Sequence, residues 1–283
     1  MLTANKAMGM LAGLSVGDAL GAPLEFTPSR EPEDYITRYA KGGAHDMDVG
    51  EWTDDTAMAV AMASAIIEQG TFDPRAIMDN FVSWYMEGKF IPRGKCFDIG
   101  TTTIRALERY IKDPACPYKG NADPDTSGNG ALMRIAPAII AAPDKTTAIT
   151  WATQQTLLTH GSEDAVLYSK IFAEELWHAD ALARYDVYRH DVDIDRKDVM
   201  SGGYVADTYR CAMWAFQTTN NFEDCVIKAV NRGHDSDTCG AVAGMIAGAH
   251  YGIGDIPDHM INGLMWRDYI TDTAYSLWKM RGM

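Results

Sequence analysis

Residues 239–252 read CGAVAGMIAGAHYG, and this stretch decides the fold. Alanine and glycine make up more than half of it, and most other positions are apolar. A second stretch of the same kind, GALMRIAPAIIAAP, covers residues 130–143. Because small side chains let two helix axes approach closely, both stretches indicate central helices of a compact all-α protein.

Outward from these stretches, apolar residues recur mainly at helical spacing, and no alternating run rich in β-branched residues predicts a strand. Two surface connections are expected, at 113–128, which is full of turn formers, and at 180–203, which is rich in charge. We therefore predict one all-α domain over residues 1–283, a compact multi-helix globule with a central cleft. Its predicted helices cover residues 4–20, 54–69, 74–87, 99–112, 130–141, 146–158, 163–179, 204–217, 222–231, 237–250 and 268–280.

Composition disfavours several classes of partner. Lysine and arginine number 25 against 39 aspartates and glutamates, and the formal net charge of −14 opposes binding to nucleic acid or an anionic membrane surface. No apolar run reaches the roughly 20 residues of a membrane span. The apolar segment after Lys6 is followed at once by Asp18 and Glu25, so it reads as the first helix rather than a secretory signal. The five cysteines are odd in number and form no C-x-x-C pair, which predicts reduced thiols in a cytoplasmic protein. Separately, we expect the protein to be a monomer.

Two like charges stand side by side in WTDDTAM, residues 52–58, with no lysine or arginine between Lys41 and Arg75. Taken alone, helix capping explains them, since carboxylates in a first turn favour the positive end of the helix dipole. A second stretch, HDSDT at 234–238, repeats the pattern, and no lysine or arginine occurs from Gly233 through Trp266. Capping does not readily explain the same chemistry twice.

The carboxylates of both stretches would repel one another if they converged unpaired, so their convergence requires a cation. All the candidate ligands are oxygens, and these suit Mg²⁺ or Mn²⁺ better than zinc. Four carboxylates are enough to hold two ions. We predict a dinuclear metal site in the central cleft where Asp54, Asp55, Asp235 and Asp237 converge, and threonine hydroxyls can join these carboxylates as ligands.

Two glycine-containing stretches each allow two interpretations. SGNG, residues 127–130, precedes a helix predicted to begin at Ala131, so its amides could hold a pyrophosphate without side-chain charge. An ordinary capping turn is the alternative. GDALG at 17–21 could serve the site or only close helix packing, with Asp18 capping or bonding a neighbour.

Four single residues also have a structural alternative. Glu25 reads equally as a solvated acid and Asp98 as the cap of the helix from Ile99. His160 reads as a satisfied histidine at a helix end. Tyr204 has two interpretations: a side chain that stacks on an adenine or ribose, or a core aromatic residue at the start of its helix.

Five motifs resemble, in their order, the ADP-ribosylglycohydrolase family. They are GLSVGDALGAPLEF at 13–26, WTDDTAM at 52–58, SGNGALMR at 127–134, TH at 159–160 and GHDSDTCGAVAGMIAGAHYG at 233–252. The resemblance spans residues 9 to 257 and is strongest to the bacterial branch typified by the dinitrogenase reductase activating glycohydrolase. The combination is specific, although each short motif alone is not.

The resemblance implies a single all-α domain with two Mg²⁺ or Mn²⁺ ions that hydrolyses the N-glycosidic bond between ADP-ribose and a protein side chain, commonly arginine. Its partners would be an ADP-ribosylated protein and ADP-ribose. The family's metal ligands fall on Thr53, Asp54, Asp55, Asp235, Asp237 and Thr238, and its glutamate near the metals falls on Glu25. The aspartate near the bond to be broken falls on Asp98. The glycine-rich loop and the ligand-side histidine fall on Ser127, Gly128, Asn129, Gly130 and His160.

One departure concerns His234, where the family usually has glycine before the metal-binding Asp235. An imidazole there would add a contact or crowd the ribose. Two other functions remain open. His-Asp pairs at 45–46, 190–191 and 234–235 are compatible with a His-Asp type metal-dependent phosphohydrolase, and a protein that binds ADP-ribose without turnover would keep the same fold.

Overall fold

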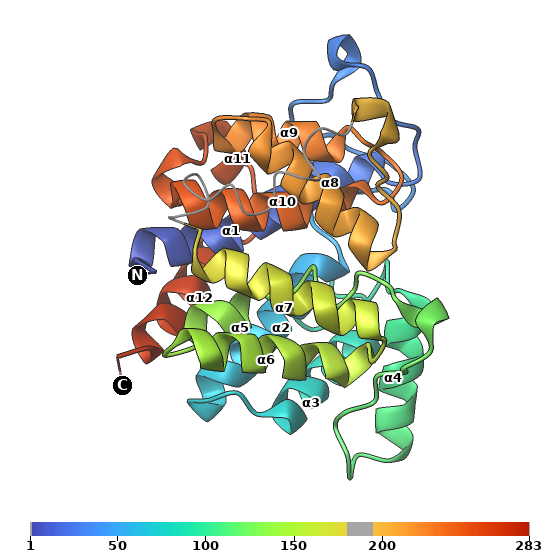
Figure 1. Ribbon diagram of the computed structural model, residues 1–283, viewed down its shortest axis with the longest axis vertical. Coiled ribbons are helices and arrows are strands. Elements are labelled where there is room, and N and C mark those ends of the chain that lie inside the picture. Colours follow the sequence, from blue (N-terminus) through green and yellow to red (C-terminus); the bar gives the residue numbers. More distant parts are fainter. Residues whose placement is uncertain (1, 180–194, 283) are drawn as a thin grey trace.

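Helices α1 (Ala4–Gly21) and α10 (Ser236–Tyr251) lie side by side at the centre of the fold, although they come from opposite ends of the sequence (Figure 1). Their glycines recur every four residues and face each other. A β-carbon built on Gly13 would lie 2.1 Å from the carbonyl oxygen of Gly244, and one on Gly244 would lie 2.0 Å from that of Gly13. The two backbones are therefore in direct contact, as the small-residue stretch at 239–252 predicts.

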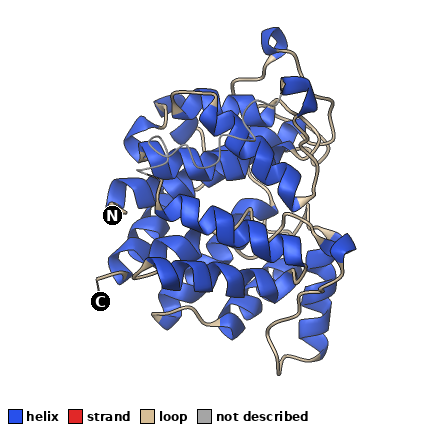
Figure 2. Cartoon of the chain, viewed as in Figure 1, coloured by secondary structure: helices blue, strands red, loops and turns tan. Residues whose placement is uncertain are grey.

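The computed structural model describes residues 2–179 and 195–282, and within them the chain is helical with only isolated β-bridges (Figure 2). The all-α class predicted from the sequence is confirmed. The other helices are α2 (Asp54–Gln69), α3 (Pro74–Glu87), α4 (Thr101–Lys112), α5 (Ala136–Ala141), α6 (Lys145–Thr159), α7 (Glu163–Trp177), α8 (Val205–Gln217), α9 (Phe222–Val230), α11 (Asp258–Ile261) and α12 (Arg267–Met280).

Local sequence explains where many of these helices begin. Several start after a residue whose side-chain oxygen accepts hydrogen bonds from the first amides of the helix, which is the usual role of an N-cap. These residues are Thr3, Asp73, Asp144, Ser162 and Asn221. Helices α2 and α3 end at glycines in the left-handed conformation, Gly70 and Gly88.

One predicted helix is wrong at its start. The helix expected from residue 130 begins only at Ala136, and residues 130–134 form turns. Pro137 explains the difference, because it has no amide hydrogen to donate and its ring excludes a helical carbonyl four positions earlier. Proline is tolerated only in the first turn, where Pro137 lies in α5.

The two predicted surface connections are only partly visible. Residues 113–128 are irregular, with one short 3₁₀ turn at Pro124–Thr126, as predicted. Of the charge-rich connection at 180–203, residues 180–194 lie outside the described residues, and so does the His-Asp pair at 190–191. All five cysteines are free, three of them buried.

The segment Ala4–Leu24 is long and apolar enough to cross a membrane by length and composition alone. Almost all of it is buried inside the fold, where α10, α12 and α2 pack against α1. A core helix passes the same test, and burial on every side identifies α1 as one.

Candidate active site

A cavity of about 390 Å³ lies where α2, α4 and α10 begin and α6 ends. Ten of the predicted site residues line it: Glu25, Asp54, Asp98, Gly128, Asn129, Gly130, His160, Asp235, Asp237 and Thr238. Thr53 and Asp55 are buried against this lining, whereas Ser127 and Tyr204 do not line the cavity. The predicted central cleft is therefore present.

The two acidic stretches meet at one end of this cavity. Thr53 Oγ1 lies 3.3 Å from Asp237 Oδ2, and Thr238 Oγ1 lies 3.4 Å from Asp55 Oδ2. The residues of these pairs are 184 and 183 positions apart in the sequence. The packing of α1 against α10 allows this meeting, because it brings the start of α10 beside the start of α2.

Asp18, on α1, fixes the start of α2. Its carboxylate accepts hydrogen bonds from the amides of Thr53 and Thr56, at 2.9 and 3.0 Å, and from the hydroxyls of both. Burial raises the pKa of Asp18 to about 6, and the hydrogen bonds from Thr56 and Thr53 oppose that rise. Asp18 thus caps α2 from a neighbouring helix, which leaves the carboxylates of Asp54 and Asp55 and the lone pairs of the Thr53 hydroxyl for the cluster.

The acidic cluster is electrostatically incomplete. Burial, reinforced by the neighbouring carboxylates, raises the pKa of Asp54, Asp55 and Asp237 well above the usual range. Oδ1 of Asp55 and Oδ1 of Asp237 are buried and have no hydrogen-bond partner among the described residues. Buried carboxylate oxygens without partners are rare in native proteins, and a hard divalent cation satisfies them. The donor set fits the predicted ions.

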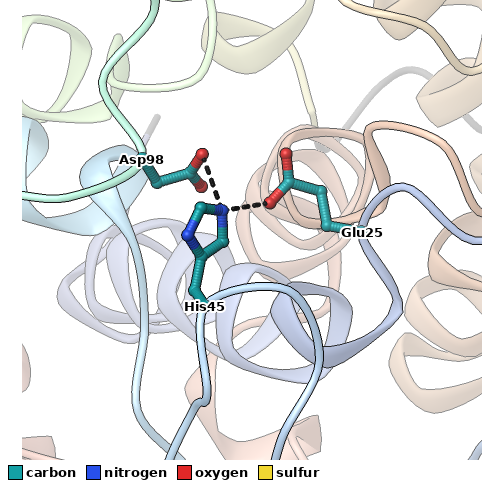
Figure 3. Close-up of side chains that lie close together, drawn as sticks. All are labelled: Glu25, His45 and Asp98. Carbon is teal, nitrogen blue, oxygen red and sulfur yellow. Dashed lines mark hydrogen bonds and ion pairs between the residues drawn. The ribbon is translucent and has the colours of Figure 1, made fainter.

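Glu25, His45 and Asp98 form a second cluster at the cavity (Figure 3). The Nε2 of His45 lies 2.9 Å from Glu25 Oε2 and 3.1 Å from Asp98 Oδ1, so one nitrogen bridges two carboxylates. Hydrogen bonds to Asp98 and Glu25 raise the pKa of His45 to about 10. Burial raises the pKa of Glu25 to about 7. His45 therefore keeps its proton at neutral pH, whereas Glu25 can gain or lose one there.

Neither structural alternative describes Glu25 or Asp98. Glu25 is buried rather than solvated, and α4 begins at Thr101 after Gly100, with no side-chain cap. The backbone of Asp98 is left-handed, with φ of 57°, a conformation that costs a non-glycine residue about 1 kcal/mol or more. Such strain at a cavity wall aims the carboxylate at His45 instead of along the helix.

The glycine-rich loop does not lie at a helix start, contrary to the prediction for residues 127–130. The amide of Ser127 donates to Pro124 O and that of Asn129 to Gly203 O, so both are used within the fold. No backbone hydrogen bond in the described residues uses the amides of Gly128 or Gly130. These two amides remain for a ligand.

The side chain of Asn129 braces the acidic cluster. Its Nδ2 donates to Asp235 Oδ2 at 2.7 Å and to Thr208 Oγ1 at 2.8 Å. Asn129 therefore orients a predicted metal ligand, and this use of the side chain differs from its predicted place in the ligand loop.

Tyr204 and His234 both lie apart from the cavity. Tyr204 is 42% exposed, and its hydroxyl donates to Asp164 Oδ2 at 2.8 Å, so a stacking role remains a prediction. His234 is exposed and lines a neighbouring cavity with Arg232 and Arg196, so its ring does not crowd the central one. Its φ of 56° explains the family's preference for glycine there.

His45 is the site residue that the sequence analysis missed. The sequence marks His45 only by its pair with Asp46, because its partners Glu25 and Asp98 are 20 and 53 positions away. The one local signal is the glycine pair that precedes it at 42–43. Gly43 has φ of 75° and touches Pro23, which holds the His45 loop against the Glu25 turn.

The comparisons with known proteins agree with these features. The sequence profile of the family described as ADP-ribosylglycohydrolase matches residues 2–283. The chain is 34% identical to the ADP-ribosylarginine hydrolase Tri1 of Pseudomonas putida, covering 96% of this chain and 78% of the relative. It is 32% identical to the ADP-ribosyl-[dinitrogen reductase] glycohydrolase of Rhodospirillum rubrum, covering 92% of this chain and 90% of the relative.

A solved structure described as an ADP-ribosylglycohydrolase-related protein complex superimposes with a TM-score of 0.83 at 32% identity, covering 98% of both chains. The family profile, the two relatives and the solved structure each match more than nine tenths of this chain. The chain belongs to the ADP-ribosylglycohydrolase family.

Proposed function

We propose that this protein is a metal-dependent hydrolase that cleaves the N-glycosidic bond between ADP-ribose and an arginine side chain of a modified protein. Two relatives that are 34% and 35% identical are both named ADP-ribosylarginine hydrolases, which supports the linkage. The observation that carries the proposal is the meeting of two acidic turns at one cavity, with two buried carboxylate oxygens that lack a partner.

Two Mg²⁺ or Mn²⁺ ions would be held by Thr53, Asp54, Asp55, Asp235, Asp237 and Thr238. When bound, such ions supply Lewis acidity for the ribose hydroxyls and a water of lowered pKa. Asp18 and Asn129 keep the ligands in place, since they fix the start of α2 and the carboxylate of Asp235.

The remaining groups suit the rest of ADP-ribose. The amides of Gly128 and Gly130, together with His160, present hydrogen-bond donors on one wall of the cavity for the diphosphate. Backbone donors bind an anion without a basic side chain, which suits a protein with a net charge of −14.

Proton transfer falls to Glu25 and orientation of the leaving group to Asp98. A pKa of about 7 lets Glu25 take or give a proton at neutral pH, where a general acid or base works best. Asp98 accepts a hydrogen bond from an imidazole in the free protein, and a guanidinium offers N–H groups of the same kind.

We propose that the protein is a cytoplasmic monomer. The five free cysteines support the cytoplasmic location. Its substrate would be a mono-ADP-ribosylated protein. A His-Asp phosphohydrolase is disfavoured, since that chemistry needs histidine ligands, whereas His234 lines a separate cavity and Nε2 of His45 contacts Glu25 and Asp98.

The test is release of ADP-ribose from arginine-, serine- and otherwise linked substrates, with and without chelator. We expect hydrolysis of the arginine linkage, its loss with chelator, and a drop of about 100-fold or more for Asp55→Ala and for Asp235→Ala. If both variants fold and keep full activity, the two-metal proposal is wrong. Calorimetric binding of ADP-ribose without any turnover would instead identify a non-catalytic ADP-ribose-binding protein.

A further inference from the structure

Arg134 is fully buried in the core, just behind the cavity wall. Its Nε lies 3.1 Å from Gln155 Oε1, its Nη2 lies 2.7 Å from Thr159 Oγ1, and its guanidinium stacks on Phe81 at 4.6 Å. An arginine side chain donates hydrogen bonds and never accepts them. Thr159 Oγ1 must therefore act as the acceptor from Arg134.

That assignment determines where the hydroxyl hydrogen of Thr159 goes. The other close polar atom is Nδ1 of His160, at 2.8 Å from Thr159 Oγ1. Since the oxygen already accepts from Arg134, its own hydrogen is free to donate to Nδ1. A neutral imidazole carries one hydrogen, so an accepting Nδ1 leaves it on Nε2.

The Nε2 edge of His160 faces the glycine-rich loop. A β-carbon built on Gly128 would lie 3.4 Å from Nε2, and one on Gly130 would lie 3.1 Å from Cε1 and 3.4 Å from Nε2. Both glycines and His160 line the central cavity. The ring thus packs beside the two loop amides that the fold leaves unused.

We propose that Thr159, held by Arg134, is a positioning residue that fixes His160 as an Nε2–H donor toward an anionic group seated on Gly128 and Gly130. The identity of that group as the diphosphate of ADP-ribose rests on the proposed function. Burial and the nearby Arg134 lower the pKa of His160 to about 3, so the ring is neutral at working pH. The tautomer, and not the charge, decides whether His160 attracts or repels an anion.

The first test needs no ligand. In ¹⁵N-histidine-labelled wild-type protein, long-range ¹H–¹⁵N spectra distinguish the two neutral tautomers, and the His160 signal is assigned by its loss in His160→Gln. We expect hydrogen on Nε2 at pH 7. Hydrogen on Nδ1, or a protonated ring, would overturn the assignment.

The second test uses a matched pair of variants. Thr159→Val removes the hydroxyl at similar volume, and Thr159→Ser keeps it. We expect a tautomer mixture and about 10-fold weaker ADP-ribose binding for the valine variant, since it weakens a hydrogen bond to a charged group, which is stronger than one between neutral groups. The serine variant should match the wild type in both measurements. KM should rise for the valine variant while kcat changes little.

The outcomes separate this inference from the proposed function. A wild-type Nε2 tautomer in a protein that hydrolyses no ADP-ribosyl-arginine would leave the positioning role intact and remove the proposed activity. Equal ADP-ribose affinity in the valine and serine variants, both folded by circular dichroism, would remove the positioning role whatever the activity.

Discussion

Thr53 Oγ1 and Asp237 Oδ2 lie 3.3 Å apart across the junction of α2 and α10, although 184 positions separate the two residues in the sequence. This contact joins two acidic turns that each look like ordinary helix starts. It brings several buried carboxylates together, and their mutual repulsion should affect the stability of the protein and its response to metal ions.

Neutralising one acid should stabilise the metal-free protein and abolish its response to metal. For Asp237→Asn we expect about 1 kcal/mol higher stability in chelator, or about 2 °C in Tm, because repulsion among buried carboxylates falls. Wild-type protein should gain stability with Mg²⁺ or Mn²⁺, and the variant should gain little. Asp272→Asn, at an exposed position on α12, is the control and should change neither value. A variant that is less stable in chelator would contradict the repulsion argument.

Removing His45 should move the pH dependence of catalysis. The hydrogen bond from His45 holds the pKa of Glu25 down against burial, so in His45→Ala that pKa rises further above its present value of about 7. A limb of the kcat/KM profile that requires ionised Glu25 then shifts to higher pH. His45→Gln keeps an N–H donor and should shift the limb less. Identical limbs in wild type and His45→Ala would exclude Glu25 as the titrating base.

The contact of α1 with α10 should tolerate no added methyl group. In Gly13→Ala or Gly244→Ala, the new carbon would meet a backbone carbonyl oxygen at 2.1 or 2.0 Å, so the two helices must separate. We expect a loss of about 3 kcal/mol or more in the free energy of unfolding. Gly254→Ala, where the nearest atom would be 3.6 Å away, should be nearly neutral in urea titrations. Wild-type stability in either helix variant would show that the helices separate at no cost.

Stability should fall as pH rises through neutrality because of Glu175. Its Oε1 accepts a 2.6 Å hydrogen bond from Tyr209, and its buried Oε2 has no partner among the described residues. Burial raises the pKa of Glu175 from 4.5 to about 7, so the folded state binds this proton more tightly than the unfolded state does. Its contribution is therefore fully present below pH 4.5 and is lost as pH rises through about 7.

The Glu175→Gln variant should remove that loss. At pH 8 we expect it to be more stable than wild type by up to about 3 kcal/mol, and at pH 5 to be similar. Glu174 pairs with Lys145 at the surface, so the control variant Glu174→Gln should follow the wild-type curve. Parallel curves for wild type and Glu175→Gln between these pH values would refute the assignment.

Restoring glycine at position 234 should relieve backbone strain. His234→Gly replaces a residue at φ of 56°, and we expect about 1 kcal/mol of added stability with little change in turnover. His234→Ala keeps the strain and should not be stabilised. Loss of metal binding in the alanine variant would instead favour the phosphohydrolase alternative.

Periodicity and motif order predict most helices, the family and ten of the residues that line the cavity. They were insufficient wherever one residue acts through a distant partner. Asp18 caps α2 from another helix, and His45 joins two acids from a loop with no helical or strand pattern. Neither relationship has a fixed spacing in the sequence.

The late start of α5 has a different cause. Residues 131–134 are good helix formers, and composition alone favours a helix there. Pro137 prevents one continuous helix, because it has no amide hydrogen to donate. Residues 129–133 form a turn instead, in which the carbonyl of Asn129 accepts hydrogen bonds from the amides of Leu132 and Met133. A proline inside an apolar run is therefore better taken as the first turn of a new helix.

The glycine contact between the first and tenth helices also sets an order of events during synthesis. A nascent chain that has not yet emerged past residue 234 holds only Asp54 and Asp55 of the acid cluster, and its helix α1 has no glycine face to dock on. Closing so long a stretch of chain is slow, since local contacts form before distant ones. Capture of divalent ions should thus be among the last steps of maturation.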